Sequence, residues 1–161
     1  MCCGRIAVGL RGLGEVVIEF QDIVQVICDR VPEVIGAVLC DQQGETIVSA
    51  MGRSEVPPEA NERAKEHVPH TMDLDMPVNE FLVRLAGAEP CGLVRQIQAA
   101  QNERAAGTLD AYVARYAEVD LIVEQLPEDL YLFVALRRPA SIGAARRFTR
   151  IAARELEPFL E

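Results

Sequence analysis

The chain has 161 residues and a mass of 17.7 kDa; half of its residues are apolar, and its formal net charge is −9. This length and composition indicate one folded domain and exclude a disordered chain or a small disulfide scaffold. The acidic balance argues against general nucleic-acid binding, which needs a basic surface. Because there is no tryptophan and only 5% of the residues are aromatic, there is also little material for stacking on bases.

The cysteines do not form the pattern of a secreted disulfide framework, because their number is odd and their spacing is scattered. They are Cys2, Cys3, Cys28, Cys40 and Cys91. Cys28 and Cys40 lie within apolar runs, where a cysteine usually acts as a small hydrophobic side chain. No stretch has the ~18 apolar residues of a membrane span, and no secretory signal is recognisable. We therefore expect a cytoplasmic protein.

The first third of the chain predicts a leader, a helix and a hairpin. Residues 1–14, with four glycines, indicate a poorly ordered leader before a single domain of residues 15–161. Apolar side chains at helical spacing predict a helix over 15–31, which Pro32 helps to end. Two apolar runs, 34–40 and 45–50, flank Asp41-Gln42-Gln43-Gly44, a sequence suited to a type I turn closed by glycine. They predict a β-hairpin.

The remainder predicts two helical segments, three strands and a final helix. Four prolines and many charges indicate an inserted surface loop over 52–77, followed by helical turns at 79–86. Pro90 suits the first turn of an amphipathic helix over 90–105. Strands are expected at 111–116, 120–126 and 130–137, the last two joined by Pro127-Glu128-Asp129.

The last helix is expected over 141–160, with Ser141 as its N-cap. Its core stripe is predicted to be Ala145, Phe148, Ile151, Ala152, Leu156 and Phe159. The resulting order is helix, two strands, helix, three strands, helix. Strands joined mostly by hairpins imply one antiparallel five-stranded sheet with flanking helices, an α+β architecture.

The sequence shows no convincing catalytic, cofactor or metal site. The glycines between 9 and 14 follow no convincing strand and lack the end of a P-loop. His67 and His70 have Pro69 between them and no accompanying ligands of fixed geometry, which favours a solvated loop. A nucleophilic site needs an oriented base, and both histidines lie in the inserted loop. We therefore expect a protein that binds rather than catalyses; an enzyme using Cys91 or the histidine pair is the weakest alternative.

Two surfaces could carry binding. The first is the helix over 90–105, with its narrow apolar stripe. The second is the polar face of the last helix, a possible docking face made of Arg146, Arg147, Arg150 and Arg154. Residues 137–161 hold six arginines and three glutamates, net +3, so the rest of the chain carries −12. A charge separation of this kind can steer an acidic partner, although an arginine-rich helix face is most often only solvated.

The hairpin Ala37–Ala50 and the segment opening with Ser141-Ile142-Gly143 resemble the Roadblock/dynein light-chain (Roadblock/LC7) family. The resemblance covers about residues 16–50 and 88–160 and is closest to the bacterial MglB type. It implies a longin-like fold and a dimer that serves as a platform for Ras-like small GTPases, without catalytic residues of its own. The process implied is bacterial cell polarity or motility.

The resemblance also implies which residues meet partners. Sheets would join edge to edge as a homodimer through the strand 111–116, with Tyr112, Ala114 and Tyr116 at the edge. The second helix would contact partners through Leu93, Val94, Ile97, Gln98 and Gln101. The connection 52–77 is longer than is usual in the family, which leaves open a paralogue such as MglC that binds another Roadblock protein. The alternative from another class is a small-molecule sensor domain on a similar sheet.

Overall fold

A computed structural model describes residues 5–8, 16–58, 84, 92, 94–100 and 109–160. The N-terminal elements are β1 (Arg5–Val8), β2 (Val16–Glu19), α1 (Phe20–Arg30), β3 (Val34–Cys40) and β4 (Thr46–Met51). The C-terminal elements are β5 (Ala111–Arg115), β6 (Val119–Leu126), a 3₁₀ turn (Pro127–Asp129), β7 (Leu130–Arg137), α4 (Ile142–Leu156) and a second 3₁₀ turn (Glu157–Phe159). Between β4 and β5, residues 84, 92 and 94–100 are helical.

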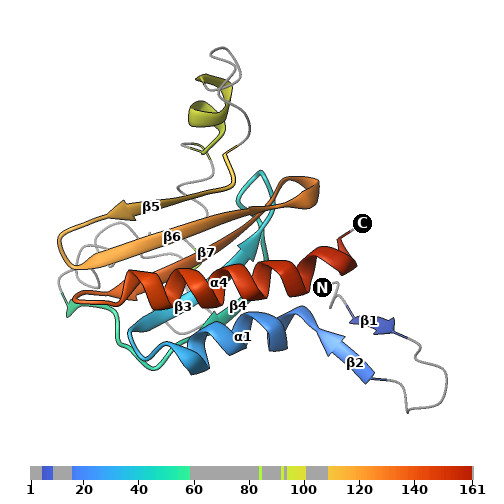
Figure 1. Cartoon of the computed structure of the whole chain (residues 1–161), viewed down its shortest axis with the longest axis horizontal. Coiled ribbons are helices and arrows are strands. Elements are labelled where there is room, and N and C mark those ends of the chain that lie inside the picture. Colours follow the sequence, from blue (N-terminus) through green and yellow to red (C-terminus); the bar gives the residue numbers. More distant parts are fainter. Residues whose placement is uncertain are drawn as a thin grey trace, which may run out of the picture.

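The main sheet has five antiparallel strands in the order β4-β3-β7-β6-β5, so β4 and β5 are its two edges. Helices α1 and α4 lie side by side across one face of this sheet (Figure 1). Phe20 at the start of α1 packs edge-on against Phe159 just beyond α4, with ring centroids 6.4 Å apart. The two helices therefore run antiparallel. This confirms the predicted five-stranded α+β architecture.

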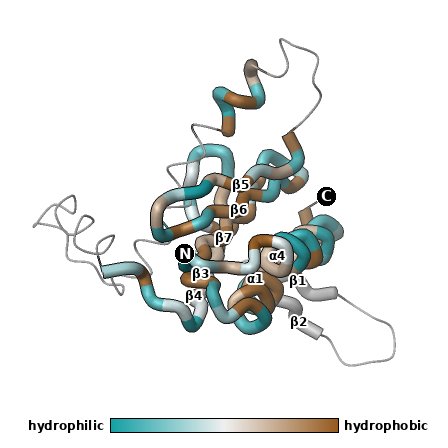
Figure 2. The backbone as a smooth tube through the Cα atoms, turned by 60° about the vertical axis from the view of Figure 1, so that its left-hand side comes forward, coloured by the Kyte–Doolittle hydropathy of each residue, from teal (hydrophilic) through white to brown (hydrophobic). Residues whose placement is uncertain are grey.

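The central strands are buried on both faces, which explains their continuous apolar sequences. On the α1/α4 face, alternate residues such as Leu39, Ile122 and Val134 join the apolar sides of the two helices. On the opposite face, a second cluster includes Val38, Val123 and Phe133. Figure 2 shows apolar colouring along β3, β7 and β6 and hydrophilic stretches along α4.

The hairpin between β3 and β4 is built as its sequence predicts. Asp41 accepts hydrogen bonds on Oδ1 from the backbone N–H groups of Gln43 (2.8 Å) and Glu45 (2.9 Å). The N–H of Gly44 donates to the Asp41 carbonyl at 3.0 Å, and Gly44 has φ of 84°, a conformation that glycine adopts without strain. Side chain and glycine together fix the turn.

Just after β4, the backbone of Gly52 lies against β3. Its N–H donates to the carbonyl of Ile35 at 2.9 Å, and a Cβ at Gly52 would lie 1.9 Å from the Val34 carbonyl oxygen. Only glycine fits this close approach. Ser54 also donates to the Val34 carbonyl at 3.2 Å, so the first residues of the predicted inserted loop still bond to β3, and residues 59–77 of that loop lie outside the described residues.

The start of the first helix differs from the prediction. Val16–Glu19 forms β2, which pairs antiparallel with β1 inside the expected leader, and α1 begins only at Phe20 (Figure 1). Residues 16–18 are Val-Val-Ile, and β-branched side chains favour strands over helices. Because the apolar residues from Val16 onward also have helical spacing, the sequence pattern alone did not distinguish a strand from a helix here.

Helix α4 begins after Ser141, as predicted, but the Ser141 side chain makes no capping hydrogen bond. Its buried side differs slightly from the predicted stripe. Thr149 is buried and its hydroxyl donates to the Ala145 carbonyl at 2.9 Å, whereas Ile151 is 38% exposed. Phe148 and Phe159 pack against the core while partly exposed. The helix is thus turned so that Thr149 faces the sheet and Ile151 lies at the exposed margin of the helix.

Candidate interaction surfaces

Strand β5 is an edge of the main sheet, and its residues form two sets according to the direction of their backbone hydrogen-bonding groups. Gln125 donates to the Asp110 carbonyl at 2.8 Å, and Tyr116 donates to the Val119 carbonyl at 2.9 Å. In an antiparallel ladder this places the backbone groups of the even-numbered β5 residues toward β6 and those of Ala111, Val113 and Arg115 outward. No residue in the described part of the chain hydrogen-bonds to these outward groups.

The other edge, β4, is capped by side chains of α1. The side-chain amide of Gln21 donates to the Ser49 carbonyl at 2.7 Å, and that of Gln25 donates to the Met51 carbonyl at 3.4 Å. Because Gly52 bonds to β3, the odd-numbered residues of β4 face away from it, so these are outward carbonyls of the edge. Unpaired edges invite pairing with another chain. Among the described residues, β5 is therefore the edge without such capping.

Two arginines and a buried carboxylate hold the turn between β5 and β6. The Asp120 side chain is 1% exposed; its Oδ1 accepts from Arg115 Nε at 3.3 Å, and its Oδ2 lies 3.8 Å from Arg138 Nε. Arg138 also donates through Nη1 to the Tyr116 carbonyl at 2.8 Å. This pairing fixes the end of β5 and orients Arg115 on the α1/α4 face of the edge strand.

The expected edge residues divide between this strand and its turn. Tyr112 and Ala114 are half-buried on the sheet face opposite α1 and α4, while Tyr116 follows the strand and is 57% exposed. The structure thus brings the three residues to the predicted edge of the sheet.

The expected second helix contacts the sheet face opposite α1 and α4. Val94 is buried in the second apolar cluster, whereas Ile97 is only partly buried. Gln98 donates through Nε2 to Gln125 Oε1 of β6 at 3.2 Å. Val94 therefore packs within the chain, and Ile97 is the apolar residue with accessible surface. Leu93 and Gln101 lie outside the described residues.

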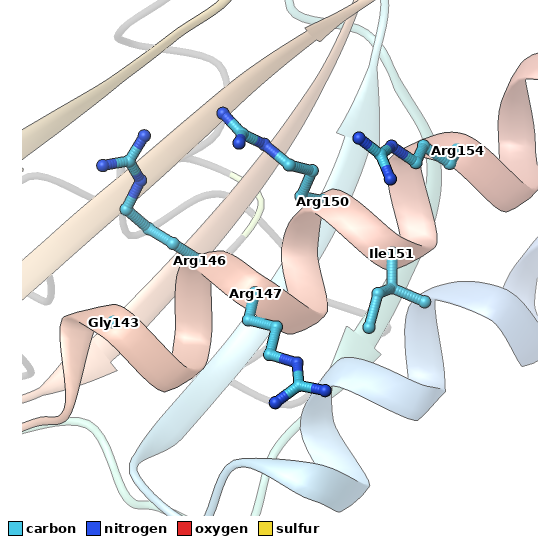
Figure 3. Close-up of a pocket in the computed structure, with 6 residues that line it drawn as sticks. All are labelled: Gly143, Arg146, Arg147, Arg150, Ile151 and Arg154. Atoms are coloured by element: carbon cyan, nitrogen blue, oxygen red, sulfur yellow. The ribbon is translucent and has the colours of Figure 1, made fainter.

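The arginines of α4 surround a shallow, open hollow of about 480 Å³. Its lining consists of Gly143, Arg146, Arg147, Arg150, Ile151 and Arg154. Figure 3 shows Arg147 and Ile151 pointing toward α1, and Arg146 and Arg150 extending from the other side of α4. An open, arginine-lined hollow does not match the enclosed apolar pocket that a small-molecule sensor requires.

One of the four arginines has a structural partner that sequence reasoning missed. Arg150 Nε lies 3.5 Å from Oε1 of Glu124, whose side chain is 9% exposed beneath α4. Burial raises the pKa of Glu124, and the positive charge of Arg150 opposes that rise. No described acidic side chain forms an ion pair with Arg146, Arg147 or Arg154. The signal available in the sequence was an acidic residue directly after the apolar run Leu121-Ile122-Val123 in β6.

The cysteines that the structure describes behave as core residues. Cys28 and Cys40 are buried and form no disulfide, and burial raises the pKa of the Cys28 thiol to about 12. Such a thiol is a poor nucleophile at neutral pH. Within the described ranges, no three His, Cys, Asp or Glu side chains gather as metal ligands. His67, His70, Cys91, Cys2 and Cys3 lie outside those ranges.

No protein-family model matches the sequence, and no curated protein matches it. Several solved structures, in contrast, match its fold. A Roadblock/LC7 domain from Streptomyces avermitilis covers 87% of this chain and 96% of its own, with a TM-score of 0.63 and 16% identity. The chain has the Roadblock/LC7 fold.

Two proteins of Myxococcus xanthus share this Roadblock/LC7 fold. MglB covers 87% of this chain and 93% of its own length, with a TM-score of 0.62 and 15% identity. MglC covers 88% and 98%, with a TM-score of 0.55 and 14% identity. The fold therefore spans almost the whole of each relative, and the predicted resemblance is confirmed at the level of the fold. No helix among the described residues has the length and apolar character needed to cross a membrane.

Proposed function

We propose that this chain is a homodimeric, non-catalytic regulator of a Ras-like small GTPase, acting in the cytoplasm in bacterial cell polarity or motility. The observation that carries the proposal is the Roadblock/LC7 fold, shared with MglB and MglC over nearly their whole length. One solved relative is described as a gliding protein, and another as MglB with a tetrameric arrangement. These descriptions support motility and self-association as properties to test in this chain.

The surfaces described above fit such a role. In the described ranges no residue bonds to the outward backbone groups of β5, whereas β4 is capped by Gln21 and Gln25. Ile97, on the helical segment against the other face, leaves part of an apolar side chain accessible next to the polar pair of Gln98 and Gln125. An apolar anchor within a polar surround is typical of protein–protein contact surfaces. The chain thus offers one edge for a second copy and one helix for a partner.

The test is affinity capture from the native cytosol with the tagged chain, in the presence of a non-hydrolysable GTP analogue or of GDP. We expect a small GTPase to be recovered in one nucleotide state and not in the other. Ile97→Glu serves as the control bait, because it places a charge on the accessible apolar residue while leaving buried Val94 in place. Recovery of no small GTPase in either state, with a folded wild-type bait, would overturn the proposal.

A further inference from the structure

We propose that a second copy of this chain docks on the outer face of helices α1 and α4, with α1 of each copy lying on α4 of the other. This contact goes beyond the proposed function, because it lies on the sheet face opposite the Ile97 segment and does not involve the edge strand β5. Both of those surfaces stay accessible when the two helix layers meet.

Each of the two helices exposes a stripe that has an apolar residue at its centre and a charge of one sign on either side. The acidic stripe is Asp22, Val26 and Asp29 on α1, and the basic stripe is Arg147, Ile151 and Arg154 on α4. The spacings are four and three residues in both stripes, so the members of a stripe share one side of their helix. The buried residues of both helices pack against the sheet on the other side.

The exposed charges of these stripes are not paired within the chain. Among the residues that the structure describes, none forms an ion pair with Asp22, Asp29, Arg147 or Arg154, although Asp29 accepts a hydrogen bond from Gln25 at 3.3 Å. Few large apolar side chains are exposed in the described ranges, and two of them are the centres of the two stripes, 39% and 38% exposed. Because the stripes lie side by side with opposite charges, the helix layer is complementary to a copy of itself.

A two-fold axis parallel to the helices brings unlike stripes together. Helices α1 and α4 are antiparallel neighbours, and Figure 3 shows Arg147 and Ile151 pointing toward α1. Rotation about an axis that lies on this layer, between the helices and parallel to them, places α1 of the second copy on α4 of the first. Rotation about an axis across the helices would instead place α1 on α1 and set aspartates against aspartates. The charges therefore select the first arrangement.

The heights of the two apolar residues agree with this symmetry. Rotation about an axis parallel to the helices keeps the height of every residue along that axis, so residues that meet must have similar heights. Counting along both helices from the contact between Phe20 and Phe159 places Val26 and Ile151 within one helical turn, ~5 Å, of the same height. Val26 of each copy can therefore pack on Ile151 of the other.

This register also matches the charges. Because α1 of one copy is antiparallel to α4 of the other, moving forward along one helix means moving back along the other. The charges then meet to within one residue, ~1.5 Å along the helix. The matched pairs are Asp22 with Arg154, and Asp29 with Arg147. Arg30 and Glu155 have the opposite sign to the stripes that they follow, but each points ~100° away from the last residue of its stripe.

Charge exchange tests the contact in the full chain. Asp22→Arg with Asp29→Arg makes both stripes positive, and Arg147→Glu with Arg154→Glu makes both negative; all four substitutions together exchange the signs. Average masses are measured by sedimentation equilibrium at about 0.15 M salt, where long-range repulsion between copies is screened. At concentrations where the wild type is fully assembled, we expect each double variant to have half the wild-type mass or less. The fourfold variant and the mixture of the two double variants should both recover the wild-type mass.

Glu45→Arg with Glu55→Arg is the matched control, because it makes the same change of net charge on exposed residues outside α1 and α4. Its mass should equal that of the wild type. Wild-type mass in both stripe variants would overturn the proposal, and loss of binding to phosphatidylserine vesicles by the α4 variant would then assign the basic stripe to a membrane surface. A fall in mass that neither the mixture nor the fourfold variant recovers would overturn it as well.

The same masses separate this contact from the homodimer of the proposed function. A stripe variant that sediments as a dimer, with a wild-type circular dichroism spectrum, still pairs elsewhere, as the proposed function expects. A stripe variant that sediments as a monomer would contradict that homodimer while leaving the helix contact standing.

Crosslinking tests the register. Val26→Cys and Ile151→Cys are made in separate chains in which Cys2, Cys3 and Cys91 are serine, and a bis-maleimide spans ~8–10 Å, the distance between the axes of packed helices. We expect crosslinked dimers only when the two chains are mixed, because the two α1 helices lie diagonally across the contact. Crosslinking of Val26→Cys with itself would mean that α1 packs on α1, and absence of crosslinks in the mixture would mean that the stripes do not meet; either result overturns the proposal.

Discussion

Replacement of Arg150 by alanine isolates the ion pair that joins α4 to the sheet. Glu124 is almost fully buried beneath α4. The guanidinium of Arg150, 3.5 Å away, is the main charge that opposes the rise of its pKa, and Arg146 opposes it more weakly. Removing one partner of a buried pair typically costs about 3–5 kcal/mol, because the remaining charge is left desolvated. Arg150 is 54% exposed, so solvent already screens this interaction. We therefore expect a loss of about 1–2 kcal/mol at pH 7.

The pH dependence has a definite sign. Because the pKa of Glu124 is raised in the folded state, ionisation of its carboxylate destabilises the fold as the pH rises through that pKa. Arg150→Ala removes a positive charge that lowers the pKa of Glu124, so the free-energy cost of ionising Glu124 in the folded state at pH 7 grows. Below the unfolded-state pKa of about 4.3, Glu124 is protonated in both states and the penalty is absent. The difference between variant and wild type should therefore shrink on acidification.

Thermal unfolding followed by circular dichroism at pH 7 and near pH 4 measures this effect. At pH 7 we expect Tm to fall by about 2–8 °C for a domain of this size. Arg147→Ala is the matched control: it removes the same side chain from the same helix, but no described acidic residue pairs with Arg147. Its effect should stay within about 0.5 kcal/mol. Equal losses in the two variants, or a loss at Arg150 that persists undiminished at acidic pH, would refute the reasoning.

Three further substitutions have expected outcomes. Gly52→Ala would force a Cβ to 1.9 Å from the backbone of β3, so calorimetry should show a loss of about 1–3 kcal/mol, and an unchanged Tm would disprove the close approach. Ile97→Glu should abolish partner capture while the chain keeps its wild-type circular dichroism spectrum, whereas Val94→Glu should unfold the chain. If both variants unfold, Ile97 is a core residue. Reversing Arg147 and Arg154 to Glu should weaken partner binding most at low salt, and unchanged low-salt binding would exclude α4 as a docking face.

Elements specified by local chemistry were predictable from the sequence. The turn after β3 is set by the Asp41 side chain and by Gly44, which are only three positions apart in the sequence. Strand β2 was not predictable in the same way, because Val16 and Phe20 keep a helical spacing while the residues between them favour a strand. Its partner β1 lies in a glycine-rich segment whose pairing is not local.

The buried charges were missed for a similar reason. Asp120 and Glu124 stand on either side of the apolar run Leu121-Ile122-Val123 in β6, and nothing in that sequence marks either carboxylate as buried. Glu124 is buried because α4 covers it, and Asp120 is buried beside Arg115 and Arg138, which both lie outside β6. The sequence of β6 encodes neither contact. Capping of β4 by Gln21 and Gln25 likewise depends on how α1 packs. The structure places β5 at an edge of the sheet, and pairing of a second copy there stays a prediction of the family resemblance.

Direct binding to a small GTPase tests the central claim most directly. Purified Ras-like GTPases encoded in the same genome, each loaded with a non-hydrolysable GTP analogue or with GDP, would be titrated with the purified chain by calorimetry. The account predicts saturable binding of one GTPase in one nucleotide state, lost with Ile97→Glu. Absence of binding by every such GTPase in both states, with a chain that remains folded and dimeric, would contradict it.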